Sequence, residues 1–216
     1  LVCKAWKQFI DDDNYLTNIQ LTEVRKRWSR TFKQHSRFTV FHWACKFSSV
    51  RIVKLFLDNQ EKLGFDVNAQ DLMGLTPLHH ACVHNNVMVV KQLLNHGLVN
   101  VGLRSETKNI HIIHSAAFNK DPKVMETVLE CQQLINIGKN VTDNDGATVF
   151  HKAAKNAHSS EPLAYLMKNA QKFNLNVNQL NDSHQNLFHK ACLYGNTKIV
   201  TFLIQNGEKY AIDLNL

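Results

Sequence analysis

The sequence contains few of the residues that break regular structure, with only 8 glycines and 3 prolines among 216 residues. Such a composition argues against a β-sandwich with many loops and against a disordered chain. No apolar run approaches the roughly 18 residues that a membrane-spanning helix needs. No stretch near the first residue has the basic, apolar and small-residue regions of a signal peptide. We therefore expect a folded, soluble protein of the cytoplasm or the nucleus.

Sequence motifs of the common enzyme classes are also missing. There is no H-E-x-x-H, no G-x-S-x-G, no G-x-x-x-x-G-K and no dinucleotide-type glycine cluster. The 12 histidines raise the question of a metal site. His80 and His84 would share a helix face, but no third and fourth ligand accompany them. We therefore predict no catalytic residue, no metal site and no cofactor.

The five cysteines include no C-x-x-C pair, and they are odd in number and widely spaced. This pattern favours reduced thiols over a disulfide framework. Three of the cysteines stand at the same point of a repeated string, where two other copies have alanine. We expect these three thiols to be buried in small-residue positions. They are Cys45, Cys82 and Cys192.

The net charge is +7, and residues 25–37 carry six basic residues and no acid. One interpretation is an anionic partner or a nuclear address. The other is the solvated face of an amphipathic segment, with Val24, Trp28 and Phe32 buried at four-residue spacing. We favour the second interpretation, and we do not expect nucleic acid as a partner.

A short string recurs five times, each copy with a polar first residue, two apolar residues and a histidine. The histidines are 37, 35, 37 and 38 residues apart. About ten residues later follows a second apolar segment, whose spacing of three and four predicts one face of a helix. We expect Leu93 and Leu203 in these segments to be buried. The five strings are Thr39–Cys45, Thr76–Cys82, His111–Ala117, Thr148–Ala154 and Asn186–Cys192.

These strings match the T-P-L-H-x-A signature of ankyrin repeats, and over residues 35–216 the chain resembles that family. The resemblance implies an all-α ankyrin-repeat solenoid of five stacked helix-turn-helix units with short hairpin loops. It also implies that the motif histidines hold the hairpins by hydrogen bonds. Gly74 and Gly146 stand where the hairpin turns, with Asn109 in that place in the irregular third repeat. Gly97 and Gly207 follow helices, and we expect them to end those helices in the left-handed conformation.

In the ankyrin family, protein partners lie along the concave face, which is lined by the hairpin tips and by two residues near the end of each inner helix. Four large apolar residues fall at such positions, namely Phe47, Met73, Phe118 and Tyr194. Alternatively, one or two of the aromatic residues among them could cover a gap left by the irregular third repeat. Neighbouring lysines suggest a partner with acidic residues. The predicted partner-binding residues are Lys46, Phe47, Leu72, Met73, Val83, His84, Lys108, Phe118, Asn119, Asn144, Asp145, Lys155, Asn156, Leu193 and Tyr194.

We predict a separate N-terminal helical segment over residues 1–34. Residues 1–16 do not fit the repeat, and within them Leu1–Asp13 resembles the last helix of an F-box. That resemblance implies binding to the Skp adaptor of a cullin ubiquitin ligase, with the repeats as substrate receptor. The residues that would contact the adaptor are Leu1, Val2, Trp6 and Ile10. Alternatively, this segment is a capping helix of a free-standing binding module. Such a module could be an IκB-like inhibitor or a pathogen effector in the host cytosol.

Overall fold

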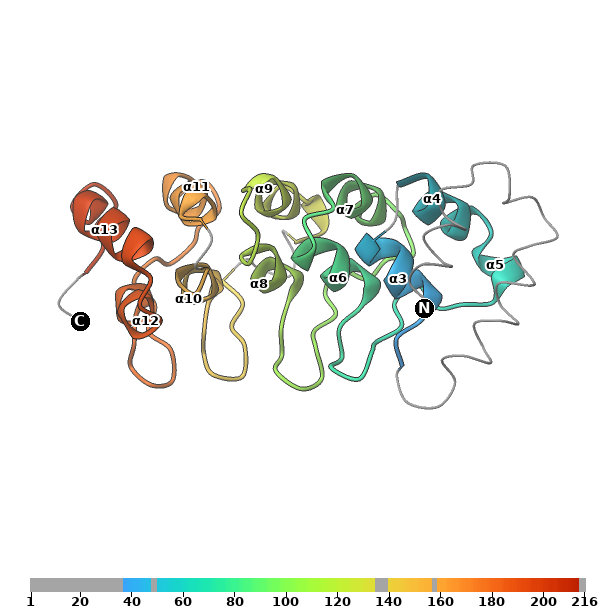
Figure 1. Cartoon of the computed structure of the whole chain (residues 1–216), viewed down its shortest axis with the longest axis horizontal. Coiled ribbons are helices and arrows are strands. Elements are labelled where there is room, and N and C mark those ends of the chain that lie inside the picture. Colours follow the sequence, from blue (N-terminus) through green and yellow to red (C-terminus); the bar gives the residue numbers. More distant parts are fainter. Residues whose placement is uncertain (1–36, 48–49, 135–139, 157–158, 214–216) are drawn as a thin grey trace.

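The computed structural model describes residues 37–47, 50–134, 140–156 and 159–213, and these residues form helices and turns without a β-strand. The helices alternate between an inner and an outer row, and hairpin loops extend from the inner row (Figure 1). The inner helices are α3 (Val40–Phe47), α6 (Pro77–Val83), α8 (Ile112–Ala116), α10 (Val149–Ala154) and α12 (Leu187–Leu193). The outer helices are α4 (Val50–Asp58), α7 (Val87–Leu94), α9 (Lys123–Leu129), α11 (Glu161–Asn169) and α13 (Thr197–Asn206). The predicted all-α solenoid is confirmed.

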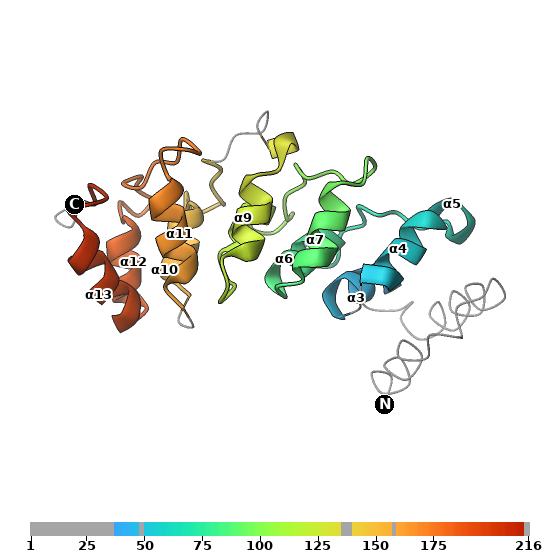
Figure 2. The same ribbon diagram turned by 90° about the horizontal axis from the view of Figure 1, so that it is seen from above.

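Each inner helix contacts the next inner helix along the stack, and the helix pairs follow one another in both views (Figures 1 and 2). Two short elements, α5 (Gln60–Leu63) and the 3-10 helix η1 (Gln132–Leu134), follow the outer helices of the first and third repeats. The proposed boundary at residue 34 and the segment before it lie outside the described residues.

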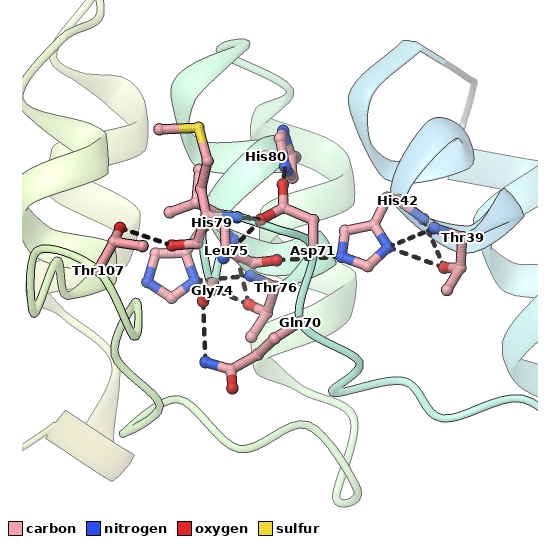
Figure 3. A network of polar contacts seen from close by, with 11 residues as sticks. Thr39, His42, Gln70, Asp71, Gly74, Leu75, Thr76, His79, His80 and Thr107 are labelled. Carbon is pink, nitrogen blue, oxygen red and sulfur yellow. Dashed lines mark hydrogen bonds and ion pairs between the residues drawn. The ribbon is translucent and has the colours of Figure 1, made fainter. Parts of the chain in front are cut away.

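Motif histidines cap the first turn of the inner helices, and four of them also bond to the backbone of the following repeat. These four are His42, His79, His114 and His151. In the second repeat, the backbone N–H of Thr76 donates to Nδ1 of His79 (3.2 Å), which makes His79 part of a capping box. Nε2 of His79 must then carry the ring hydrogen, and it donates to the carbonyl oxygen of Ile110 (3.0 Å) in the next hairpin. His42 makes the same pair of contacts, with Thr39 and Leu75 (Figure 3). The hydrogen-bonding role implied for the motif histidines is therefore confirmed for four of the five, whereas His189 bonds within the described residues to Asn186 of its own repeat.

One continuous core runs between the two rows of helices, and both leucines predicted to be buried belong to it. Leu93 is 1% exposed and Leu203 is 0% exposed. Cys45 and Cys82 are buried as predicted, and burial raises the pKa of both thiols. The same prediction is wrong for Cys192, which is exposed. It lies on the last repeat of the described chain, where no further described repeat covers it.

The hairpins turn through a residue with positive φ, as the glycine pattern predicted. Gly74 (φ 74°) and Gly146 (φ 68°) take this conformation, and Asn109 and His184 take it in the corresponding places of two other hairpins. Glycine is needed at position 74 also because a Cβ there would clash with the backbone nitrogen of Glu106 in the neighbouring hairpin.

The expectation of left-handed glycines at the helix ends is wrong. Gly207 follows α13 with φ −55° and ψ −51°, which is right-handed, and Gly97 is not among the glycines with positive φ. The backbone keeps the helical hand through Gly207, since the chain continues there into a further turn. α7 ends at Leu94, and its C-cap residue is Asn95, also right-handed, so the helix has already ended before Gly97.

Candidate functional site

A groove of about 380 Å³ lies between the hairpin tips and the inner helices. Residues from three hairpins and from α6, α8, α10 and α12 meet along it, although they are far apart in the sequence. Seven predicted partner-binding residues line this groove. They are Met73, Val83, Lys108, Phe118, Asp145, Lys155 and Tyr194.

The hairpin tips that form one side of the groove are connected to each other. The side chain of Thr107 donates to the backbone of the preceding hairpin (3.1 Å). The backbone N–H of Asn144 donates to the carbonyl oxygen of Lys108 (3.1 Å), and that of Asp182 donates to the carbonyl oxygen of Asp145 (3.1 Å). This continuous rim holds the groove in shape before any partner arrives, which reduces the entropy lost on binding.

Three of the described hairpins are also held by an acidic or amide side chain at their base, and the hairpin before α8 is held by the hydroxyl of Ser105. Oδ1 of Asp71 accepts from the N–H groups of Met73 (2.8 Å) and Leu75 (2.9 Å), while Oδ2 accepts from Nε2 of His80 (2.8 Å) (Figure 3). Burial acts to raise the pKa of Asp71, but these hydrogen bonds outweigh it and hold the pKa below its ordinary value.

The role of these acids was not predicted from the sequence. Asp143 repeats the arrangement, since it accepts from the N–H groups of Asp145 (2.9 Å) and Ala147 (2.9 Å) and pairs with Lys152 of α10. In both repeats the aspartate stands three residues before the hairpin glycine. That D-x-x-G spacing is the sequence signal that could have identified these supporting residues.

The exposed apolar residues of the groove are large. Met73 is 55% exposed, Tyr194 46% and Phe118 37%. Phe47, at 54%, lies outside the groove, where its ring packs on Trp43 (4.5 Å between centroids). Side chains that filled interior gaps would be buried, so this exposure does not fit the gap-covering alternative.

Several predicted residues are accessible but do not line the groove. Lys46 and His84 lie beside Phe47 near the ends of α3 and α6, with Nζ of Lys46 4.8 Å from the centroid of the Phe47 ring. Leu72 is 61% exposed and Leu193 63% exposed, and Asn144 is exposed on its hairpin tip.

The prediction is wrong for Asn119 and Asn156, which are each 4% exposed. α8 and α10 are 5 and 6 residues long, whereas α6 and α12 have 7 residues. Because these two helices end early, the asparagines fall in the turns that follow, and their side chains reach into the stack.

The buried asparagines form a ladder that links four repeats. The Nδ2 groups of Asn119, Asn156 and Asn196 each donate to a carbonyl oxygen near the end of the preceding inner helix. Asn156 and Asn196 donate also to the backbone of the ladder residue before them, Asn119 (2.5 Å) and Asn156 (2.8 Å) respectively. Carbonyl groups that a helix end would leave unsatisfied thereby gain a partner inside the protein.

Replacing Asn156 by alanine is expected to lower the free energy of unfolding by about 1–3 kcal/mol, because the carbonyl oxygens of Ala117 and Asn119 would lose a buried donor. Urea unfolding followed by circular dichroism would measure the change. The matched control is Asn95→Ala at an exposed position, which should change stability by less than about 0.5 kcal/mol. Equal effects at the two positions would contradict the ladder.

The charge of the groove is predominantly positive. One acidic residue, Asp145, lines it together with four lysines, Lys108, Lys152, Lys155 and Lys190. Lys152 forms an ion pair with Asp143. Nζ of Lys155 lies 5.0 Å from the centroid of the Tyr194 ring, a cation–π contact. No ion pair in the described part of the chain involves Lys108, Lys155 or Lys190.

A second hollow, of about 780 Å³, lies on the outer side between α7 and α9. Its walls carry positively charged lysines and negatively charged glutamates, including Lys123 and Glu126. None of the large exposed apolar side chains lines it. It lacks the apolar anchors that interfaces use, so the groove is the stronger candidate site.

Within the described ranges, no three histidine, cysteine, aspartate or glutamate side chains come together as metal ligands. In the same ranges, no helix is long and apolar enough to cross a membrane.

A family model described as ankyrin repeats (3 copies) matches residues 26–105 and 113–215. The chain is 27% identical to the ankyrin repeat protein FPV031 of fowlpox virus (strain NVSL) over 147 residues, 67% of this chain and 42% of that protein. It is 27% identical to palmitoyltransferase ZDHHC13 of Homo sapiens over 178 residues, 81% of this chain and 26% of that protein. It is 25% identical to rabankyrin-5 of Mus musculus over 171 residues, 79% of this chain and 14% of that protein. The chain thus spans less than half the length of these relatives.

Proposed function

Because the chain belongs to the ankyrin-repeat family, we propose that it binds a protein partner along this groove and performs no chemistry of its own. The observation that carries the proposal is the convergence of Met73, Phe118 and Tyr194, all exposed, on one groove with a connected rim. Methionine and aromatic residues are enriched in protein interfaces and supply much of their binding energy.

The groove offers no activated group for catalysis. His151 lines it, but Nδ1 of this residue accepts from Thr148 (3.0 Å) and Nε2 donates to the carbonyl oxygen of Gln185 (2.8 Å). Both ring nitrogens are therefore engaged in the repeat structure, and burial lowers the pKa of His151. A general base needs a nitrogen that is free to face a substrate, which His151 does not have.

The double variant Phe118→Ala and Tyr194→Ala is expected to weaken partner binding at least about tenfold. Aromatic side chains that become buried in an interface supply much of its binding energy. The melting temperature should stay nearly unchanged, because both rings are exposed. Quantitative mass spectrometry of proteins captured by each variant would measure the loss. Ile204→Ala, exposed on α13 and outside the groove, is the control and should retain the partner. Equal capture by all variants would place the binding surface elsewhere.

We further propose that residues 1–34 bind the Skp adaptor of a cullin ubiquitin ligase and that the repeats present a substrate. The support is the F-box-like pattern of Leu1–Asp13, including Trp6 and Ile10. All of these residues lie outside the described part of the chain. Co-purification of the adaptor, weakened by Trp6→Ala, would test the proposal, and absence of the adaptor would contradict it. The similarity to the fowlpox virus protein favours the alternative, a pathogen effector in the host cytosol, over an IκB-like inhibitor.

A further inference from the structure

The groove is chemically different at its two ends. Met73 on the hairpin before α6, Val83 of α6 and Phe118, which follows α8, form an apolar end. Lys155, directly after α10, and Lys190 of α12 form a basic end beside Tyr194. Lys108 lies between the two ends, on the hairpin that follows the hairpin of Met73. Because the inner helices follow one another in chain order along the stack (Figure 1), the two ends are separated along the length of the groove.

The lysines of the basic end have positive charge available for a partner. Lys152 is largely buried and neutralised by Asp143, whereas Lys155 is exposed. The Lys155 ammonium lies over the ring of Tyr194, which orients it without neutralising it. In the described chain, neither Lys155 nor Lys190 forms an ion pair with a carboxylate. Unpaired positive charge in a groove attracts acidic groups and fixes their register.

We propose that the groove binds an extended acidic segment of a partner protein in one orientation. An apolar side chain of that segment occupies the Met73–Phe118 end, and its carboxylates lie at the Lys155–Lys190 end. This inference rests on the proposed partner-binding function and specifies the partner's chemistry.

A peptide fits this groove better than a nucleic acid does. A nucleic acid carries a phosphate charge at every nucleotide, so some phosphates would lie along the apolar end and beside the exposed carboxylate of Asp145. A peptide can place its apolar and acidic side chains separately, in the order that the two ends require.

Selection of a displayed library of random 16-residue peptides on the whole 216-residue chain would test the proposal. We expect the enriched peptides to be acidic and to contain an apolar residue at a fixed side of the acidic cluster. Their enrichment should fall at least about tenfold on the double variant Lys155→Glu and Lys190→Glu, and also on Phe118→Ala. The control double variant Lys54→Glu and Lys168→Glu makes the same charge change at exposed sites on α4 and α11 and should bind like the original chain.

The orientation can be read by carbodiimide cross-linking, which joins a peptide carboxylate to a nearby lysine. Cross-links are expected at Lys155 and Lys190, and cross-links mainly at Lys108 or Lys46 would overturn the orientation. Enrichment of neutral or basic peptides that still depends on Phe118 would overturn the acidic partner but leave the groove as a binding site. Tight binding of a 16-nucleotide single strand that displaces the peptides would overturn the choice of a peptide. No enrichment over the Phe118→Ala variant would overturn the proposed binding function as well.

Discussion

Replacing Leu93 by alanine is expected to lower the free energy of unfolding by about 2–5 kcal/mol, the usual range for removing a buried leucine side chain. Leu93 is 1% exposed on α7, which contacts α4, α6 and α9. The removed atoms would leave a cavity between three repeats that the surrounding helices cannot fully close. Urea unfolding would measure the change. Leu203→Ala in the last repeat should cost a similar amount, since Leu203 is 0% exposed.

The matched control for Leu93→Ala is Leu98→Ala, five residues further along the same repeat. Leu98 is 59% exposed, so the same change should alter stability by less than about 0.5 kcal/mol. Unfolding of the Leu93→Ala chain is expected to be less cooperative, because the stability of stacked repeats is nearly a sum of local and neighbour terms. A neutral Leu93→Ala would show that the helix register is wrong.

Acidification from pH 7 to pH 5 is expected to lower the free energy of unfolding by several kcal/mol, on the order of 5. Burial lowers the pKa of His42, His79 and His114 to about 4, although hydrogen bonds to the next hairpin partly oppose it. Burial and neighbouring histidines lower the pKa of His111 to about 3. These four side chains therefore stay neutral in the folded protein at pH 5.

The direction follows from proton binding. In the unfolded chain a histidine has a pKa of about 6.5, so between pH 6.5 and pH 4 the unfolded state binds more protons than the folded state. The stability from these neutral histidines is fully present above pH 6.5 and is lost as the pH falls toward 4. Urea unfolding at a series of pH values would measure the slope. A free energy of unfolding that is flat from pH 7 to pH 5 would contradict the prediction.

His111→Thr gives a specific control for the pH dependence. Three other repeats have threonine where the third repeat has His111, namely Thr39, Thr76 and Thr148. Threonine can cap the helix without a titrating ring, so the variant should lose part of the pH slope. A pH slope of His111→Thr equal to that of the original chain would show that His111 does not contribute to it.

The sequence by itself determined the repeat architecture. The capping pairs, such as Thr76 with His79, lie three residues apart, so their hydrogen bonds are local and their pattern is visible along the chain. The buried positions of Leu93 and Leu203 follow from helical periodicity, which is also local. Of the 15 residues predicted at the partner surface, seven share one groove, because family position in a regular repeat fixes the face on which a side chain lies.

The tertiary structure alone decided the features that depend on partners some 40 residues away. Aligning the repeats places Asn119 and Asn156 on the surface. Their side chains are buried instead, because they donate hydrogen bonds to the carbonyl oxygens of Cys82 and Ala117 in the preceding repeats. Cys192 has the sequence context of a buried thiol, yet it is exposed because burial in a stack comes from the following repeat. The separation of apolar and basic ends in the groove likewise arises only when residues from three hairpins and four helices are brought together.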